Sequence, residues 1–383
     1  MAKLRAVDPV YRTALPDKTR VFLLTRYEDV AALLRDERFT KNRRSALTPE
    51  QARNLPWIPS MFRPLERNML DLDPPDHTRL RSLVHQAFTP RLVEDLRARV
   101  QTVADELLEA VSLRGQMDVV NDYALPLPIT IITEILGVPT RDRHKFHKWT
   151  QAVVSLTSPS PTLRVLPVVW RFIRYLRHFF KVRQRDPHND LVSALIHAEE
   201  SGDRLSQNEL LAMVFLLLIA GHETTVNLIS GGVLALLENP DQMKKLRSDQ
   251  ELIKPAVEEL LRYTSPVFMT TERYALEDVS IHGVPIAKGE MVLGVIGSAN
   301  RDENVFACPD ELDLGREPNR HLSFGHGIHF CLGAPLARLE AQIAFKTLLR
   351  RMPHLRLNAS PDSLRWQPSM MLRGLKALPV RFP

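Results

Sequence analysis

Apolar residues recur every three or four positions in several segments of the chain, which is the pattern of helices that bury one face. The segment 90–112 is the clearest example, and its regularly spaced apolar residues are Val93, Leu96, Val100, Val103, Leu107 and Val111. Charged residues occupy positions between them. We therefore predict one helix over this segment, with its apolar face against the core.

A second helical segment runs from Ser206 to Asn239–Pro240. Ser206 and Glu209 have the spacing of an N-terminal capping box, and Pro240 stops the helix. The expected helix has about 30 residues and is about 45 Å long. Its stretch 210–220 (LLAMVFLLLIA) has no polar face, so we expect it to be buried in the interior. This apolar run falls short of the roughly 20 residues that cross a bilayer.

Strand patterns are few and short, at 21–25, 279–281 and 291–296. The 28 prolines divide the chain into many short helical units, without repeats or regular βαβ alternation. We expect one mainly α domain over residues 1–383, with a long central helix and a small β-rich subregion. The Ser- and Pro-rich segment 157–167 is expected to be a surface loop.

Charge and cysteine content narrow the class of protein. The net charge of +6 comes from 51 basic and 45 acidic residues, which we interpret as mixed along the chain rather than gathered for nucleic-acid binding. The mild excess suits an acidic protein partner. The N-terminal residues MAKLRAVDPVYR have no apolar leader, which favours a cytoplasmic protein. Two cysteines, Cys308 and Cys331, are too few for a disulfide framework.

Cys331 lies in the glycine-rich stretch 324–333 (FGHGIHFCLG), directly before an amphipathic segment. A thiol before a helix N-terminus faces unpaired N–H groups and the positive end of the helix dipole, which lower its pKa. Such a sulfur can bind a metal, and Gly325, Gly327 and Gly333 let the backbone approach a flat ligand. The other readings, in order of merit, are a zinc site of His326, His329 and Cys331, a redox-active thiol, and a plain loop.

The pattern Phe-x-x-Gly-x-x-x-Cys-x-Gly resembles the haem-binding loop of the cytochrome P450 family. The resemblance implies a P450 fold, haem b as cofactor and Cys331 as the thiolate ligand of its iron, with Phe324, Gly325 and Gly333 around it. It covers nearly the whole chain and is closest in appearance to soluble bacterial members that act on polyketides and macrolides. The family usually has some twenty residues more at the start, so we expect an incomplete first helix.

The sextet Ala220-Gly221-His222-Glu223-Thr224-Thr225 puts an acid and an alcohol inside the predicted core helix, where both need partners or water. Taken alone, it is explained by a helix that kinks at glycine. The resemblance implies that it faces the oxygen side of the haem, where Thr224 steadies dioxygen and Glu223 relays protons. Because the family's peroxide-driven branch replaces this pair, the resemblance favours a monooxygenase. A peroxide-driven oxidase and a non-catalytic haem gas sensor are the alternatives.

Two further groups of charged residues match family positions. Glu259 and Arg262 share a helix face, where an isolated pair would be a surface ion pair. In the family the pair is a buried structural lock, for which we expect Arg320 or His321 as a third member. The matches to the haem-propionate contacts are His77, Arg81, Arg273 and His329, each of which could otherwise be a solvated charge.

The resemblance also implies a substrate pocket and partners. The pocket is expected to use Trp57, Met61, Phe62, Val267, Phe268, Met269 and Met370, although methionine is more often core filler. A mostly apolar pocket suits a hydrophobic substrate, hydroxylated or epoxidised with O2. Since no reductase is fused, electrons should come from a ferredoxin or flavodoxin with its reductase. Candidate docking residues are Arg97, Arg99 and Arg338, although solvated helix charges are the more common explanation of each. We expect a monomer without nucleic-acid or membrane partners.

Overall fold

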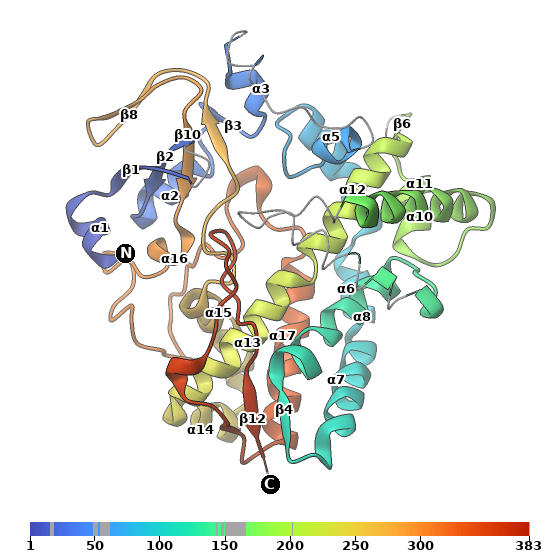
Figure 1. Ribbon diagram of the computed structural model, residues 1–383, viewed down its shortest axis with the longest axis vertical. Coiled ribbons are helices and arrows are strands. Elements are labelled where there is room, and N and C mark those ends of the chain that lie inside the picture. The colour runs from blue at the N-terminus through green and yellow to red at the C-terminus, as the bar shows by residue number, and fades with distance from the viewer. Residues whose placement is uncertain are drawn as a thin grey trace. The chain divides into compact units, whose positions relative to one another are not determined.

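Helices make up most of the protein, and its strands are short (Figure 1). This computed structural model describes residues 1–15, 19–48, 53, 62–142, 145–146, 149, 166–200 and 202–382. Contacts along the chain define two compact units, each with its own interior. The first comprises Met1–Leu47, Arg97–Pro128 and Glu223–Pro383, and the second comprises Thr48–Leu96 and Ile129–His222.

The first unit combines a helix cluster with the larger sheets. Its described helices include α1 (Ala2–Val7), α2 (Tyr27–Leu33), α3 (Arg43–Ala46), α7 (Arg97–Ser112), α13 (Glu223–Glu238), α14 (Pro240–Ser248), α15 (Ile253–Thr264), α16 (Ile296–Ala299) and α17 (Ala334–Arg351). The π-helical turn η2 is Val119–Ala124, and the 3-10 turns are η6 (Gln250–Leu252), η7 (Gly327–His329) and η8 (Pro361–Ser363). Within this unit α13 and α7 each pack against α17, and α13 also packs against α15.

The five-stranded sheet has the order β1-β2-β10-β7-β3, in which β2 and β10 are parallel and the other neighbours antiparallel. Its strands are β1 (Val10–Ala14), β2 (Arg20–Leu24), β3 (Phe39–Thr40), β7 (Arg273–Ala275) and β10 (Met291–Gly294). Alternating residues of β2 bury against two different core clusters, with Phe22 and Leu24 in one and Val21 and Leu23 in the other. Both faces of β2 are therefore covered.

The remaining strands form small ladders. A three-stranded sheet has the order β11-β12-β4, with β4 (Gln116–Asp118), β11 (Arg356–Leu357) and β12 (Pro379–Arg381). A hairpin joins β8 (Val279–Ile281) to β9 (Val284–Ile286). The three strand predictions are confirmed, with ends shifted by one or two residues in β2 and β10.

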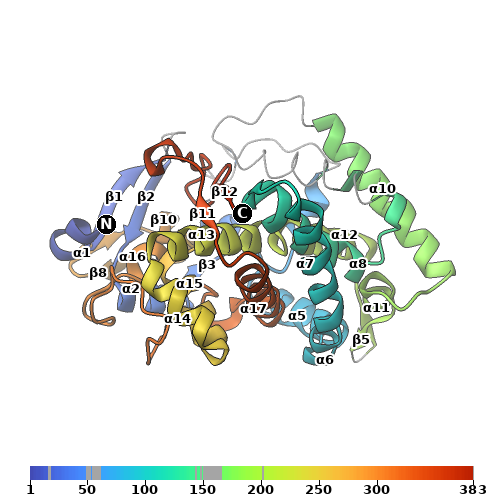
Figure 2. The ribbon, with the colours of Figure 1, turned by 90° about the horizontal axis from the view of Figure 1, so that it is seen from below.

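The second unit is almost entirely helical in its described part. Its elements are η1 (Arg63–Glu66), α5 (Asp76–Ala87), α6 (Pro90–Asp95), most of α8 (Pro126–Ile135), η3 (Thr140–Asp142), α10 (Leu166–Arg185), α11 (Leu191–His197), α12 (Gln207–Ala220) and the pair β5 (Glu199–Glu200) and β6 (Asp203–Arg204). Figure 2 shows α10 beside α11, against which it packs. The predicted loop 157–167 falls mainly outside the described residues.

The prediction of one helix over 90–112 is wrong, because the chain turns at Leu96 between α6 and α7. The Leu96 N–H donates to the Val93 carbonyl, three residues back, so the last turn of α6 tightens and the helix ends. The predicted apolar face is correct for α7, whose buried residues include Val100, Val103 and Val111.

The predicted long helix has the expected ends but is interrupted. The capping box at Ser206 and Glu209 is formed, and α13 ends before Asn239–Pro240. A turn at Gly221–His222 separates α12 from α13. By length and composition Gln207–Glu238 is apolar enough to cross a membrane, yet 56% of its most apolar window is buried, as in a core helix.

Candidate functional site

The Cys331 sulfur lies beside the start of α17. Gly333 is the N-cap of this helix, and an ideal Cβ built on Gly333 would lie 4.0 Å from Cys331 Sγ. The Cys331 N–H donates to the Phe324 carbonyl at 2.9 Å, which closes the loop. Cys331 is half-buried and is not in a disulfide. The predicted position of the thiol at a helix N-terminus, where a thiolate is stabilised, is confirmed.

Two glycines give the loop before Cys331 its shape. Gly325 and Gly327 both have φ of +71°, in the left-handed region that side chains disfavour. A Cβ on Gly327 would also lie 2.8 Å from the Leu34 carbonyl oxygen, which is too close for any side chain. Glycine is thus needed at 327 for backbone conformation and for packing.

Charged residues of α15 and α17 support Phe324, the other end of the loop. Arg338 makes a bidentate pair with Glu258, with N–O distances of 2.7 and 2.8 Å, and its guanidinium carbon lies 4.4 Å from the centre of the Phe324 ring. His321 also reaches Glu258, at 3.1 Å. Burial alone would raise the pKa of Glu258, but Arg338 and His321 lower it to about 2. Arg338 is therefore engaged within the protein, which weakens its candidacy for partner docking.

The zinc reading of the loop is not supported by the donor geometry. Across the described part of the chain, which includes His326, His329 and Cys331, no three His, Cys, Asp or Glu side chains lie close enough together to hold a metal ion. A haem iron needs only one protein sulfur on its proximal side.

The turn at Gly221 is where the predicted acid–alcohol pair lies. The Gly221 N–H donates to the Leu217 carbonyl at 3.0 Å, and a Cβ on Gly221 would lie 2.4 Å from that oxygen. His222 is buried, with Nδ1 2.6 Å from the Leu218 carbonyl oxygen. Glu223 and Thr224 then begin α13. As predicted, the helix opens at the glycine.

The expectation that this part of the helix is fully buried is wrong. Residues 210–214 are buried, whereas Gly221, Glu223 and Thr224 are half-buried and Ala220 is exposed. The apolar residues Leu216 and Ile219 are half-buried beside the exposed Ala220, which suits contact with an apolar ligand. Burial raises the pKa of Glu223 above its ordinary value, which favours a carboxyl that can carry a proton.

Glu259 and Arg262 form a fully buried ion pair on α15. Both side chains are 0% exposed, and their N–O distances are 2.7 and 2.8 Å. Arg262 also donates to the carbonyls of Asn300, Pro309 and Glu311. The prediction of a buried lock rather than a surface pair is confirmed.

The predicted third member of this lock is wrong. Arg316 fills that role, with Nε 3.2 Å from both oxygens of Glu259, and Asn319 donates to Glu259 at 3.0 Å. His321 instead contacts Glu258, and the Arg320 carbonyl accepts from Tyr27. The physical reason is the path of the 309–319 loop, which brings Arg316 rather than Arg320 back to α15.

The four residues matched to propionate contacts have these positions. His77 and Arg81 lie one turn apart on α5, with His77 buried and Arg81 half-buried. Burial, and then the charge of Arg81, lower the pKa of His77. In the first unit, Arg273 is buried on β7 and His329 is half-buried in η7. That they hold propionates stays a prediction.

Two of the predicted pocket segments are brought together in the first unit. Val267 pairs with Leu372 in a β-bridge, and the Phe268 N–H donates to the Met371 carbonyl at 2.7 Å. Met269 is buried, whereas Met370 is 41% exposed. In the second unit Phe62 precedes η1 and is half-buried. Trp57 and Met61 lie outside the described residues.

Sequence reasoning missed a buried carboxyl group on α17. Glu340 is 1% exposed and lies on the helix face that also buries Leu336 and Ile343. Burial raises its pKa to about 8, against a smaller opposing effect of the Thr225 hydroxyl on α13. The signal was an acidic residue at an apolar position of the amphipathic pattern, four residues after Leu336.

Replacing Glu340 by glutamine is expected to remove a pH-dependent loss of stability. The folded pKa of about 8 exceeds the reference value of 4.5, so the unfolded chain releases a proton that the folded protein keeps. Stability therefore falls as pH rises from about 5 to 8, by roughly 3 kcal/mol at pH 7. Denaturant unfolding at pH 5 and pH 8 should show E340Q gaining on the parent protein at the higher pH. Parallel pH profiles would contradict the buried neutral carboxyl.

Comparison with known proteins decides the family. A family profile described as "Cytochrome P450" matches residues 171–377. The chain is also 45% identical to the polyketide biosynthesis cytochrome P450 PksS of Bacillus subtilis, over 99% of this chain and 94% of that protein. The chain belongs to the cytochrome P450 family. The match to the solved structure of PksS spans 99% of this P450 and 95% of that chain, with a TM-score of 0.92 and 43% identity.

Two other similar proteins give the range of relatives. The mycinamicin IV hydroxylase/epoxidase of Micromonospora griseorubida is 41% identical over 99% of this P450 and 94% of its own length. The structure of P450BioI in complex with an acyl carrier protein ligated to hexadec-9Z-enoic acid has a TM-score of 0.89 and 41% identity, covering 100% of this P450 and 97% of that chain. The predicted P450 fold, with a mainly helical chain and a small β-rich region, is confirmed.

As a cytochrome P450, the protein is a haem monooxygenase whose cofactor is haem b, held through a cysteine thiolate. The residues present fit that group. Within the first unit one sulfur lies at the positive end of α17, where a thiolate is stabilised. Such enzymes use O2, a hydrophobic substrate and redox partners.

Proposed function

We propose that this P450 hydroxylates or epoxidises a hydrophobic polyketide- or macrolide-like compound in bacterial secondary metabolism. The observation that carries the proposal is the pairing of a Cys331 sulfur at the start of α17 with Glu223 and Thr224 at the opened start of α13. The substrate class is supported by relatives named for polyketide biosynthesis and for mycinamicin IV oxidation.

We propose Cys331 as the iron ligand, because the helix N-terminus favours its anionic form. Phe324 shields the sulfur from water, and Gly325 and Gly333 leave room beside it. The proposed propionate contacts are His77, Arg81, Arg273 and His329, whose N–H groups can donate to carboxylates. When bound, the haem supplies the dioxygen activation and the oxidising oxygen.

On the oxygen side we assign separate tasks to an acid and an alcohol. The Thr224 hydroxyl would donate a hydrogen bond on the side of the haem where dioxygen binds. The Glu223 carboxyl would take up protons and pass them on. The raised pKa of Glu223 suits this task, since it brings the carboxyl closer to neutrality at working pH. We propose that Ala220 and Gly221 lie against the haem, where the small side chain of the exposed Ala220 leaves space. The pocket proposed for substrate uses Trp57, Met61, Phe62, Val267, Phe268, Met269 and Met370.

Replacing Thr224 by alanine is expected to lower product formed per electron donor consumed by about tenfold or more. The alanine cannot donate the ordering hydrogen bond, so reducing equivalents are lost without product. Turnover should be measured with reductant plus O2 and, separately, with hydrogen peroxide. Thr102→Ala, at an exposed hydroxyl of α7, is the matched control. No loss with O2 would contradict the role of Thr224. Product from the parent protein with hydrogen peroxide but not with reductant plus O2 would favour a peroxide-driven oxidase, and no product by either route would favour a gas sensor.

For partners we propose a ferredoxin or flavodoxin with its reductase as electron source. We further propose that residues 1–383 act as one domain, monomeric and cytoplasmic, without nucleic-acid or membrane partners.

Screening hydrophobic compounds for a low-spin to high-spin change of the ferric spectrum tests the substrate class. Polyketide and macrolide compounds that all leave the spectrum unchanged and give no product would contradict it.

We also propose a second form of substrate, an acyl chain attached to a carrier protein. The P450BioI relative was solved with such an acyl-loaded carrier. An acyl chain presented in this way can occupy the same apolar pocket. The P450 must then also recognise the surface of the carrier protein.

A further inference from the structure

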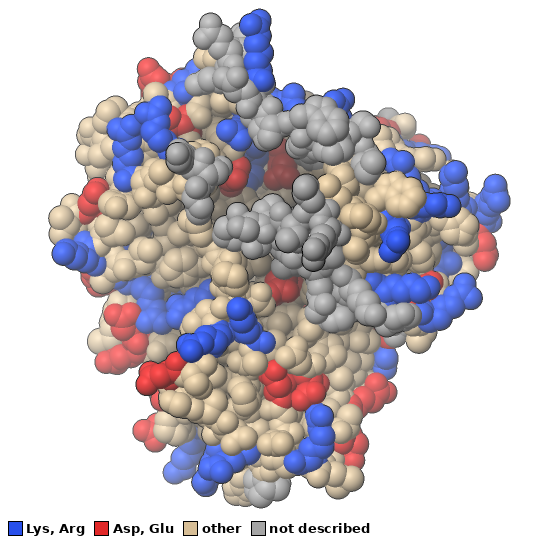
Figure 3. All heavy atoms as spheres, viewed as in Figure 1, with Lys and Arg blue, Asp and Glu red and all other residues tan. Residues whose placement is uncertain are grey.

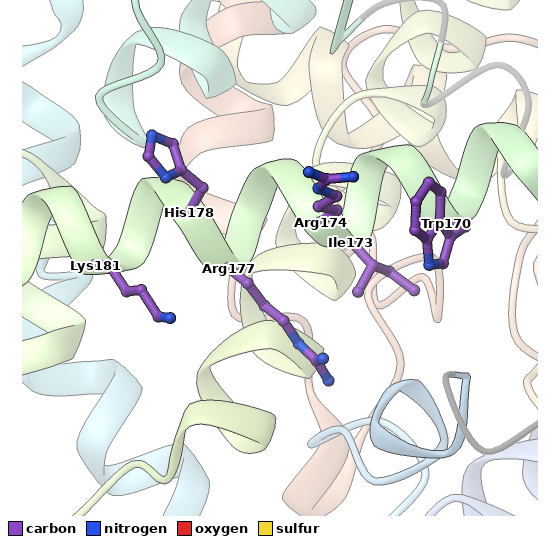
Figure 4. Close-up of a pocket in the computed structure, with 6 residues that line it drawn as sticks. All are labelled: Trp170, Ile173, Arg174, Arg177, His178 and Lys181. Carbon is purple, nitrogen blue, oxygen red and sulfur yellow. The ribbon is translucent and has the colours of Figure 1, made fainter.

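The exposed side of α10 carries a row of basic residues that begins beside a tryptophan. Trp170, Arg174, Arg177, His178 and Lys181 are exposed and lie at the spacing of one helix side, and we call them the α10 face. With Ile173 they line a recess of about 320 Å³, shown in Figure 4. The opposite side of the helix is buried through Phe172, Leu176, Phe179 and Phe180. Packing of this buried side holds α10 in place, and with it the basic residues on the exposed side.

The charge of this region is strongly one-sided. Residues 143–185 contain ten Lys and Arg residues and no Asp or Glu, although the whole chain has a net charge of only +6. The expectation that basic and acidic residues are mixed along the chain is therefore wrong for this segment. Figure 3 shows Lys and Arg gathered over α10 on the face in view.

The cations of the α10 face have no acidic partner in the described part of the chain. Arg183 of α10 pairs with Asp190, but no described ion pair includes Arg174, Arg177 or Lys181. Arg174 instead lies over the ring of Trp170, at 5.6 Å from its centre. Uncompensated like charges on one face repel each other, and an acidic partner would relieve that repulsion.

The shape and chemistry favour a helical acidic protein as the occupant. From Trp170 to Lys181 the row is about 16 Å long, which equals about three turns of a facing helix. Trp and Arg are the side chains that most often dominate protein–protein binding, and Trp170 is 42% exposed. Arginine also forms paired hydrogen bonds with carboxylates, which suits an acidic partner.

We propose that the α10 face is the docking surface for an acidic carrier protein that presents the acyl substrate. This inference rests on the proposed function in its carrier-bound form. Acidic side chains of a partner helix would pair with Arg174, Arg177 and Lys181, and its apolar residues would cover Trp170.

The test compares two double variants with equal change of charge. R174E/R177E reverses the α10 face, and K3E/K244E makes the same change at exposed lysines elsewhere. An acyl carrier protein loaded with a hexadecenoyl chain is titrated into each haem-loaded protein, and Kd is measured by calorimetry at two salt concentrations. We expect R174E/R177E to raise Kd about tenfold or more and flatten its salt dependence, and K3E/K244E to change Kd less than twofold.

Free hexadecenoic acid separates this inference from the proposed function. Its spin-state change should be equal in all three proteins, because the α10 face recognises only the carrier. Unchanged carrier affinity in R174E/R177E, or no carrier binding by the parent protein, would overturn the docking inference even where free acid still binds. The docking inference would also be overturned if R174E/R177E kept the carrier affinity of the parent protein but lost its binding to anionic phospholipid vesicles or duplex DNA.

Discussion

Replacing Cys331 by serine is expected to abolish the strongly red-shifted band of the reduced carbonyl complex, together with monooxygenase turnover. A hydroxyl at this position stays neutral, whereas the thiol is beside the N-terminus of α17 and is favoured as the anion. Without an electron-donating thiolate, O–O cleavage is no longer promoted. Difference spectra of the reduced protein under carbon monoxide, with haem content measured in parallel, check this expectation.

The chain contains its own matched control, since Cys308 is its other cysteine. Cys308 is exposed in the loop 301–311, and C308S should keep the spectrum, haem content and turnover of the parent protein. Unaltered colour and oxygen chemistry in C331S would remove the basis for the proposed iron ligand. A loss in both variants would indicate a general effect of serine on folding.

Breaking the buried pair on α15 should produce the largest loss of stability. Glu259→Gln leaves the Arg262 guanidinium, which is 0% exposed, without its counter-charge and weakens the contacts of Arg316 and Asn319. Removal of one partner of a buried ion pair costs about 3–5 kcal/mol. Denaturant unfolding of the haem-loaded protein, followed by far-UV circular dichroism, measures the change.

An exposed pair gives the comparison. Glu199→Gln removes the partner of Arg204, whose side chain is 65% exposed, and should cost less than about 1 kcal/mol. The double variant Glu259→Gln/Arg262→Met should lose less than the sum of its single changes, because the fully buried Arg262 charge is no longer left without its partner. Equal small effects at Glu259 and Glu199 would contradict the lock.

Local chemistry could be predicted from the sequence where short-range rules decide it. The capping box of Ser206 and Glu209, the helix start after Gly333 and the end before Pro240 all depend on residues within four positions of each other. The resemblance to cytochromes P450 identified the Glu259–Arg262 pair as buried, which the isolated motif does not indicate.

Features that depend on distant packing were not predictable. The choice of Arg316 over Arg320 depends on how the 309–319 loop returns to α15, and local pattern does not contain that path. The turn at Leu96 replaces a helix that the apolar spacing alone favours. By contrast, the lack of acidic residues in segment 143–185 is visible in the sequence. Its relevance to partner binding became clear only when the structure placed exposed cations of this segment on one side of a helix.

Glu258 and Glu259 are neighbours in sequence but bind different partners, Arg338 and His321 for one and Arg262, Arg316 and Asn319 for the other. Adjacent positions of an α-helix point about 100° apart. Inserting a single residue into the first turn of α15 would rotate both carboxylates away from their cations at once. The rotational phase of this helix is thus constrained from two directions, and evolution can change the length of the loops around it far more freely than its own.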